Sequence, residues 1–581
     1  MHTLLLGGVL LAYVVIAWQS IQAPLFVLDD GAELAYIRSH PSLAELFQHD
    51  CFLFFRPGKN LCFLAFSALL PMGMTACRLL VVLIGVGSAL AVLALFRQLL
   101  PKSGMALAAI ACWLLAPTLV TVTAWLSAVN ILLMTGLSAA SLLLFLRSRA
   151  STGRKSLQQL AGAGFAALLA MFCYEGAVCL PALMVLLEFY LHPARAWSLR
   201  SFRAYALFAA ALVLYLVLRH LRSVGGQQLL CGNFGAATDL QVALAAPWFF
   251  FQHFLIWLWP FGHQAIIGSY FHGQVPTGML VCAWVGAIVL AAGCLLLRRM
   301  PVVALGLAWY LVAFLPMSNL LAFRNGPYGD YYLALASMGL ALAFGWTIGT
   351  LFECARQGRS LLVVVVVLGG WRLAAAGESL AWSRAWNEPE RVLQRTLATF
   401  PTAFSAMNEY ARLLYQAGDN DGCLAWTDRA LALAPHCLSS FELRALVAVR
   451  QGKFEQAQVE VDRFLQFGGA GQSWGWYFKG YLLDEQMGDT NGAIRCYQQA
   501  VAQRIGWTTD VLDAMNALAF FAVQKGDRRT AIDLWEQVVR ADPGRVQVRQ
   551  NLVRAYAESG DRERAQQQLE IVQKELHGKQ R

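Results

Sequence analysis

Long apolar runs separated by short polar loops occupy the chain from residue 1 to about residue 375. A run of about 20 apolar residues is long enough to cross the hydrocarbon core of a bilayer as a helix. The pattern therefore predicts a polytopic helical bundle with about eleven membrane spans. We expect these spans near residues 3–21, 77–97, 105–123, 125–146, 158–173, 176–191, 203–220, 277–297, 302–320, 331–351 and 360–375.

Two further apolar stretches lack the features of a span. Residues 61–71 are too short, and residues 247–262, PWFFFQHFLIWLWPFG, are rich in Trp and Phe. Because aromatic side chains concentrate at the headgroup level of a bilayer, we interpret both stretches as helices that lie along the outer interface. A twelfth span at 247–262 is the alternative, and it would reverse the orientation of every later segment.

The chain after residue 375 has a different composition, rich in Gln, Glu, Arg and Ala. Glycines at positions 418, 452, 488, 526 and 560 are separated by 34, 36, 38 and 34 residues, and a small residue follows each one five positions later. This is the period of tetratricopeptide repeats, paired helices that stack into a superhelix. The chain is therefore predicted to be all-α, with a membrane domain at 1–375, a linker at 376–400 and a repeat α-solenoid at 401–581.

Charge sets the expected orientation. The net charge is +10, and many Lys and Arg lie in short loops between apolar runs, so we interpret the excess as topological and expect no nucleic-acid partner. One alternate set of loops holds basic residues at 97–102, 147–155, 195–203, 298–299 and 356–359. Basic loops stay in the cytoplasm. We therefore expect an inner (plasma) membrane protein with a cytoplasmic N-terminus and with periplasmic or extracytoplasmic repeats.

Cysteines and the first apolar run add little chemistry. The thirteen cysteines show no CxxC motif and no metal-ligand spacing, and Cys423 and Cys437 would pair only in an oxidising compartment. We predict no cofactor, although a carboxylate-bound divalent cation stays open. The run from Leu4 to Trp18 lacks a basic n-region and a clear cleavage site, so we expect a retained helix rather than a signal peptide.

Ionisable residues gather in the segments that are predicted to face outward. Asp29, Asp30 and Glu33 follow the first span, Arg56 precedes the short apolar stretch, and Glu175 separates two apolar runs in MFCYEGAVCLP. A charged group near membrane depth is costly and marks a functional site by default.

A later segment, PMSNLLAFRNGPYGDYY, adds Arg324, Asp330 and Tyr331. If the spans bundle, carboxylates and guanidinium groups converge on one outer cavity. Transfer from a phosphate-linked donor needs both kinds of group. A carboxylate accepts the proton of the incoming hydroxyl, and a cation holds the leaving phosphate.

Four stretches carry a family resemblance: FVLDDGAELAYI, FRPGKNLCF, MFCYEGAVCLPALMVLLEF and LPMSNLLAFRNGPYGDYYLALASMG. In their order they resemble the membrane-embedded GT-C glycosyltransferases and, more narrowly, the transmembrane-and-tetratricopeptide O-mannosyltransferases of eukaryotes and their bacterial relatives. Two positions depart from that family. Tyr174 stands where members often have Lys, and Tyr331 stands where an Arg commonly follows the acid.

The resemblance implies a hexosyltransferase that moves a sugar from a polyprenyl phosphate to an acceptor hydroxyl, with inversion. The acceptor would be a secreted or periplasmic protein or peptide, held by the repeats. Either Asp29 or Asp30 would be the base, and Arg56 or Arg324 would hold the phosphate. Glu33, Glu175, Asp330 and Tyr331 would line the substrate site.

Structural roles and other functions remain as alternatives. Asp29 and Asp30 could cap a helix, Glu175 could be a paired structural acid, and Arg56 could be an interface anchor. An oligosaccharide ligase or polymerase is one rival function, but it would not need an acidic pair after the first span. A non-enzymatic membrane-anchored repeat scaffold is the other rival.

Overall fold

The computed structural model describes residues 2–24, 30–39, 46–51, 54–222, 239–259, 261–263, 277–296, 300–320, 329–355, 359–468, 472–486, 488–504 and 507–578. Every regular element in these ranges is a helix. The chain forms two compact units. The first is Met1–Glu33 with Leu46–Tyr410, and the second is Leu34–Glu45 with Ala411–Arg581.

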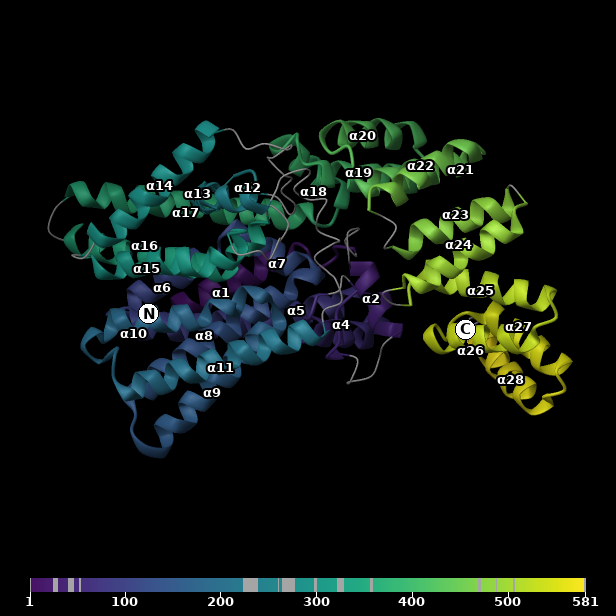
Figure 1. Cartoon of the computed structure of the whole chain (residues 1–581). Coiled ribbons are helices and arrows are strands. Elements are labelled where there is room, and N and C mark those ends of the chain that lie inside the picture. The colour runs from purple at the N-terminus through teal and green to yellow at the C-terminus, as the bar shows by residue number, and fades with distance from the viewer. Residues whose placement is uncertain are drawn as a thin grey trace. The chain divides into compact units, whose positions relative to one another are not determined.

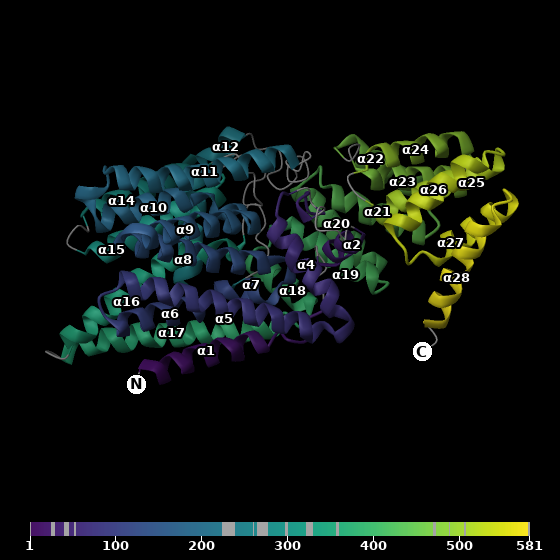
Figure 2. The same ribbon diagram turned by 90° about the horizontal axis from the view of Figure 1, so that it is seen from below.

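The first unit contains most of the apolar helices. Figures 1 and 2 show α8, α9 and α11 running side by side, as do α5, α6, α16 and α17. Its α-helices are α1 (His2–Trp18), the start of α2 (Asp30–Ser39), α4 (Pro57–Leu69), α5 (Met74–Leu99), α6 (Ser103–Leu114), α7 (Val120–Ala124), α8 (Val129–Ala150), α9 (Gly153–Cys173), α10 (Leu180–Leu191), α11 (Leu199–Arg222), α12 (Asp239–Leu244), α13 (Ala246–Leu258), α14 (Thr277–Leu296), α15 (Pro301–Phe314), α16 (Leu333–Ala355), α17 (Arg359–Ala385) and α18 (Pro389–Thr399).

Six helices among the described residues are long and apolar enough to cross a membrane. They are Met74–Leu99, Leu126–Ala150, Gly153–Cys173, Leu199–Arg222, Asp330–Ala355 and Val363–Ala385. The expected span at 105–123 is a bent pair, Ser103–Leu114 and Pro117–Ala124, with an angle of 58°. The expected spans at 3–21, 277–297 and 302–320 correspond to shorter apolar helices, so a count of eleven stays a prediction.

The other expected elements of this unit appear with altered bounds. The stretch 61–71 falls in α4 and the 3-10 helix Leu70–Met72 that follows it. Residues 247–258 of the aromatic stretch lie in α13, a helix of 13 residues. The expected linker at 376–400 is largely helical, because α17 continues to Ala385 and α18 follows.

Two glycines bring α15 and α16 into backbone contact. A Cβ atom on Gly306 would collide with the carbonyl oxygen of Gly339, and a Cβ atom on Gly339 would collide with that of Gly306. Small residues that let backbones approach closely are the usual basis of helix packing in membranes. This contact therefore fixes where the two helices cross.

Five helix pairs build the second unit from α19 onward, although the first residues of α19 belong to the first unit by contact. The helices are α19 (Phe404–Gln416), α20 (Asn420–Leu433), α21 (Leu438–Arg450), α22 (Phe454–Gln466), α23 (Ser473–Glu485), α24 (Thr490–Ala502), α25 (Thr509–Gln524), α26 (Arg528–Ala541), α27 (Val546–Glu558) and α28 (Arg562–Gly578). The small residues that recur in the sequence, including Ala457, Ala493 and Ala531, are fully buried. Cys423 is buried and Cys437 is half-buried, and the structure records no disulfide between these two described residues.

The recurring glycine and the Asp that follows it have separate roles in the turn. Gly418, Gly452, Gly488, Gly526 and Gly560 all have positive φ, between 66° and 88°, which a residue with a Cβ atom adopts only with strain. The next residue caps the second helix of the pair. The side chains of Asp419, Asp489 and Asp527 accept hydrogen bonds from backbone N–H groups three residues later, at 2.8–3.1 Å. Lys453 stands at the corresponding position before α22 and makes no such bond.

We expect Asp489→Ala to destabilise the start of α24 by about 1 kcal/mol, because the N–H of Gly492 loses its acceptor. Hydrogen exchange of the full-length chain, measured by mass spectrometry on peptides of α24, should show faster exchange in the first turn. The matched control is Asp484→Ala on α23, which removes no cap. Equal exchange in the two variants would contradict the assigned role.

Candidate functional site

The buried polar centre of the first unit is a chain of alternating charges. Arg56 Nε donates to Glu175 Oε2 at 2.8 Å, and Arg56 Nη2 donates to Glu175 Oε1. Asp50 Oδ2 lies 3.9 Å from Arg56 Nη1 and 3.7 Å from Lys59 Nζ. Lys59 in turn donates to Glu33. Only Arg56 has notable exposure, with 12% of its side chain accessible. Three carboxylates therefore face two cations in a largely enclosed space.

Local backbone geometry places these side chains. Arg56 precedes Pro57, which begins α4, and Lys59 lies in the first turn of that helix. The side chain of Asp50 accepts a hydrogen bond from the backbone N–H of Phe54 at 2.9 Å, two residues before Arg56. Glu175 opens the 3-10 helix η4 (Glu175–Cys179), where the chain passes from α9 to α10. The break in MFCYEGAVCLP is thus a real interruption between two helices.

Asp30 lies beside the 3-10 helix η3 (Leu126–Ala128) and is fully buried. It accepts hydrogen bonds from the backbone N–H of Ser127 at 2.9 Å and from the Ser127 hydroxyl at 2.6 Å. Arg78 interacts with its charge and donates to the carbonyl oxygens of Ala23 and Pro24, both at 3.0 Å. Asp30 is therefore held as an acceptor, while Asp29 lies outside the described residues.

Asp330, another of the predicted acids, is the first residue of the 3-10 helix η9 (Asp330–Tyr332). Asp330 is fully buried and accepts from the hydroxyl of Thr121 at 3.0 Å, and His263 Nδ1 lies 3.9 Å from it. Tyr331 packs edge-on against Trp125, with ring centroids 5.6 Å apart. Arg324 lies outside the described residues.

Stacked aromatic rings connect the two acidic regions. The guanidinium of Arg56 lies 4.7 Å from the ring centroid of Tyr174, and Tyr174 stacks on Tyr332 at 6.5 Å. Tyr332 contacts Tyr331 at 4.5 Å, which leads on to Trp125. Tyr174 is therefore part of the centre, between the ion pair and η9.

The structure thus brings together six of the eight predicted site residues: Asp30, Glu33, Arg56, Glu175, Asp330 and Tyr331. The residues that contact them and that sequence reasoning did not select include Asp50, Lys59, Thr121, Ser127 and His263. Lys59 had a usable signal, because its position three residues after Arg56 puts both cations near the start of one helix. Ser127 and Thr121 had none, since a hydroxyl in an apolar run has no distinctive spacing.

The electrostatics of Glu175 indicate a permanent negative charge. Burial works to raise its pKa, but the attraction of Arg56 and the hydrogen bonds from it outweigh burial and lower the pKa to about 2. Such a carboxylate does not take up a proton near neutral pH. Glu175 therefore acts as the group that orients Arg56, and the proton acceptor of any reaction has to be another acid.

His263 leads to a prediction about acid stability. Burial lowers its pKa from 6.5 to about 3, so the unfolded chain binds a proton that the folded protein does not. This contribution to stability is complete above pH 6.5 and is lost as the pH falls toward 3. We expect the free energy of unfolding in detergent to fall over that range by up to about 1.4 kcal/mol per pH unit from this group.

His263→Asn should remove the share of the slope that this group contributes, while leaving the stability near pH 8 comparatively unchanged. Burial also lowers the pKa of His253 from 6.5 to about 4, so His253 supplies slope that remains in the variant. Glu175 adds to the loss only below pH 4.5, since its pKa is lowered from that value. A variant with the wild-type slope between pH 6.5 and 5 would show that His263 is not the group responsible.

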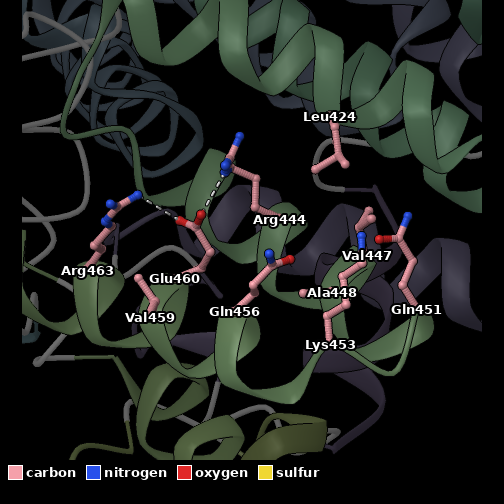
Figure 3. Close-up of a pocket in the computed structure, with 10 residues that line it drawn as sticks. All are labelled: Leu424, Arg444, Val447, Ala448, Gln451, Lys453, Gln456, Val459, Glu460 and Arg463. Carbon is pink, nitrogen blue, oxygen red and sulfur yellow. Dashed lines mark hydrogen bonds and ion pairs between the residues drawn. The ribbon is translucent and has the colours of Figure 1, made fainter.

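The repeat unit has a separate pocket of about 320 Å³, formed mainly by α21 and α22. Figure 3 shows Arg444 and Arg463 directed toward Glu460. Arg444 Nε lies 2.9 Å from Glu460 Oε1, and Arg463 Nη1 lies 3.6 Å from Glu460 Oε2. Lys453 also lines the pocket, so cations outnumber the acid.

No group of three or more His, Cys, Asp or Glu side chains suited to a metal ion occurs within the described ranges.

These features define an all-helical protein with an apolar helical unit and a repeat unit. The family model for the tetratricopeptide repeat matches residues 522–579, so the chain carries this repeat. No curated protein matches the chain.

Solved structures similar to this chain are tetratricopeptide proteins and cover about a third of it. MamA of Desulfovibrio magneticus RS-1 is 14% identical over 30% of this chain and 96% of its own, with a TM-score of 0.26. YrrB, described as a TPR protein with an unusual peptide-binding site, is 19% identical over 32% of this chain and 98% of its own, with a TM-score of 0.25. PilF of Pseudomonas aeruginosa is 14% identical over 30% and 76%, with a TM-score of 0.27.

Proposed function

We propose that the protein is a membrane glycosyltransferase that transfers a sugar from a polyprenyl phosphate to a hydroxyl of a protein acceptor. The observation that supports it best is the enclosed network of Glu33, Lys59, Asp50, Arg56 and Glu175. Burying an ion pair costs free energy, because both charges lose their hydration. Ionisable groups among apolar helices therefore mark functional sites by default. Every predicted site residue that the structure describes joins this network or the adjoining aromatic and acidic groups.

The proposed reaction is a single displacement. The acceptor oxygen attacks the anomeric carbon, the bond from that carbon to the phosphate oxygen breaks, and the acceptor proton passes to Asp29 or Asp30. Glu175 occupies Nε and Nη2 of Arg56 and thereby fixes the plane of the guanidinium. Nη1, outside that bidentate pair, is the group that we assign to the leaving phosphate, with Arg324 as the second candidate.

The repeat unit would hold the acceptor. Arrays of this kind present extended surfaces that bind peptides or proteins, and the similar protein YrrB is described as having a peptide-binding site. The pocket lined by Arg444, Lys453 and Arg463 favours an acceptor segment with acidic side chains.

The test is a comparison of the wild type with Asp29→Asn, Asp30→Asn and the double variant. Each would be incubated with polyprenyl-phosphate hexoses and a cell-envelope extract, and glycosylated products would be sought by mass spectrometry. We expect the double variant to lose activity by at least about 100-fold, since removing a general base costs that much or more. Equal labelling by the double variant and the wild type would refute the proposed base.

The control for this test is Glu353→Gln, which removes a carboxylate from an exposed ion pair with Lys102. Its activity should match the wild type. Absence of labelling by the wild type with every donor would instead favour the competing proposal, a repeat scaffold without enzymatic activity, which the match at residues 522–579 supports.

A further inference from the structure

The pocket of the repeat unit lies between two second helices. Its lining residues come from α21, from the turn after it, and from α20 and α22, the second helices of two successive pairs. Arg444 and Val447 are among the lining residues of α21. Glu442 lies on the opposite side of that helix, because residues two positions apart are separated by about 200°, and it pairs with Arg412 of the first helix α19 at 3.2 Å. The pocket is therefore separate from the surface where these first helices pair with each other.

Part of the pocket lining is apolar. Val447 and Ala448 are buried, Leu424 is half-buried, and Val459 is 50% exposed. The volume of about 320 Å³ is near the lower limit of about 300 Å³ for ligand pockets, so the pocket suits a few side chains. An apolar side chain that covers Val459 removes apolar surface from water, which is favourable in proportion to the area buried.

The ion pairs of the pocket leave one cation without a partner. Arg444 pairs with Asp428 of α20 and with Glu460 of α22. Arg463 Nη1 lies 3.6 Å from Glu460 Oε2. Within the described residues, the side chain of Lys453 has no ion pair and no hydrogen bond. Figure 3 shows Lys453 and Arg463 in different parts of the pocket, with Glu460 close to Arg463. The charge that the pocket lacks is therefore negative, and it is lacking beside Lys453.

Glu460 leaves a hydrogen-bond acceptor in the pocket. The residue is 7% exposed, and its Oε1 atom accepts from Arg444 Nε at 2.9 Å. Its Oε2 atom is buried and accepts no hydrogen bond within the described part of the chain. Buried polar atoms normally have a hydrogen-bond partner. A ligand with an N–H group, such as the backbone of a peptide, supplies that donor.

We propose that this pocket binds an extended segment of the acceptor protein in which an apolar side chain and a carboxylate side chain lie close together. The apolar side chain covers Val459, the carboxylate pairs with Lys453, and a backbone N–H of the segment donates to Glu460 Oε2. The segment thus complements each group that the pocket leaves exposed or unpaired. The inference rests on the proposed function, because it takes the segment from the acceptor, and it adds the chemistry by which acceptors are selected.

The experiment measures peptide binding by the full-length chain, purified in a mild detergent, through the fluorescence anisotropy of a labelled peptide. The probes are three synthetic peptides of equal length on a Gly-Ser background. The first has a Leu flanked by Asp residues, the second has Asn in place of each Asp, and the third has Ser in place of the Leu. We expect the first to bind and each replacement to weaken binding about tenfold or more, because each removes one contact with the pocket.

Lys453→Asp reverses the charge of the pocket without removing support from the fold. At three other turns an Asp at this position caps the following helix, so the variant should unfold at the same temperature as the wild type or at a higher one. Its affinity for the first peptide should fall by at least about tenfold, because like charges then face each other. Loss of binding with retained stability cannot result from unfolding.

The matched control is Lys525→Asp. Lys525 is an exposed lysine at the end of α25, away from the pocket residues in sequence, and it has no ion pair within the described residues. Its variant should bind the first peptide as the wild type does. Val459→Ser should weaken binding of the first peptide and leave the weaker binding of the Ser peptide unchanged, since only the Leu contact is lost.

Equal affinity of Lys453→Asp and the wild type for the first peptide would overturn the proposal. Equal affinity of the wild type for the Asp and Asn peptides, or no binding of the first peptide, would also overturn it. The assay needs no sugar donor and no turnover, so the two proposals fail separately. Peptide binding by a chain that transfers no sugar would count against the proposed function alone, and sugar transfer to a protein without peptide binding would count against this inference alone.

Discussion

Glu175→Gln is expected to destabilise the first unit by about 3–5 kcal/mol, which is the usual cost of removing one partner of a buried ion pair. The substitution keeps the shape of the side chain, removes its charge and turns one of the two oxygens that accept from Arg56 into an NH2 donor. Arg56 then remains enclosed, 12% exposed, with Asp50 at 3.9 Å as its nearest remaining carboxylate. The measurement is the free energy of unfolding in detergent micelles by chemical denaturation.

The matched substitution is Glu353→Gln, in an ion pair whose partners Glu353 and Lys102 are 43% and 57% exposed. An exposed pair contributes about 0–1 kcal/mol, because water screens it. Both variants remove one carboxylate charge from an ion pair, and they differ in whether that ion pair is buried or exposed. The difference between their losses of stability therefore measures the effect of burial. Losses of similar size in both would show that the Arg56–Glu175 pair is not enclosed as described.

Gly306→Val should destabilise the bundle by about 3 kcal/mol or more, at the upper end of the usual cost of overpacking. The new side chain would meet the backbone of Gly339, and a carbonyl oxygen cannot rotate aside as a flexible side chain does. Relief requires α15 and α16 to separate. That separation would also shift η9, which precedes α16 and carries Asp330.

The control for this prediction is Gly87→Val on α5. Gly87 is exposed, and no atom lies within 4 Å of the position of its missing Cβ. Valine is a better helix former than glycine, so this variant should be as stable as the wild type or slightly more stable. Unfolding in detergent measures both variants, and equal stability of Gly306→Val and Gly87→Val would mean that the helices do not cross at these glycines.

The sequence pattern was sufficient for the helical class and the repeats, because both depend on local periodicity. The turns of the repeats were predictable from glycine spacing alone, and the following Asp could be placed as a cap once the helix bounds were known. Helix lengths were harder to predict. Apolar character continues through bends such as the one between α6 and α7, so hydropathy does not reveal that the helix breaks there.

The acids of the candidate site were found because charge is rare in this part of the chain. Their partners were not found by the same logic. Ser127 lies 97 residues from Asp30, and Thr121 lies 209 residues from Asp330, so no local signal relates them.

At most junctions of the array, a glycine and a capping Asp make the turn between the two helices of a pair self-contained. In such a pair, the glycine that ends the first helix and the Asp that caps the second both belong to the pair itself. The pair can therefore be gained or lost as a unit without changing the other turns, so the number of repeats is free to evolve. The junction between α21 and α22 is the exception, since Lys453 stands where the Asp would be. Under mechanical load or partial denaturation, the array should come apart there first, beside the pocket that Lys453 lines.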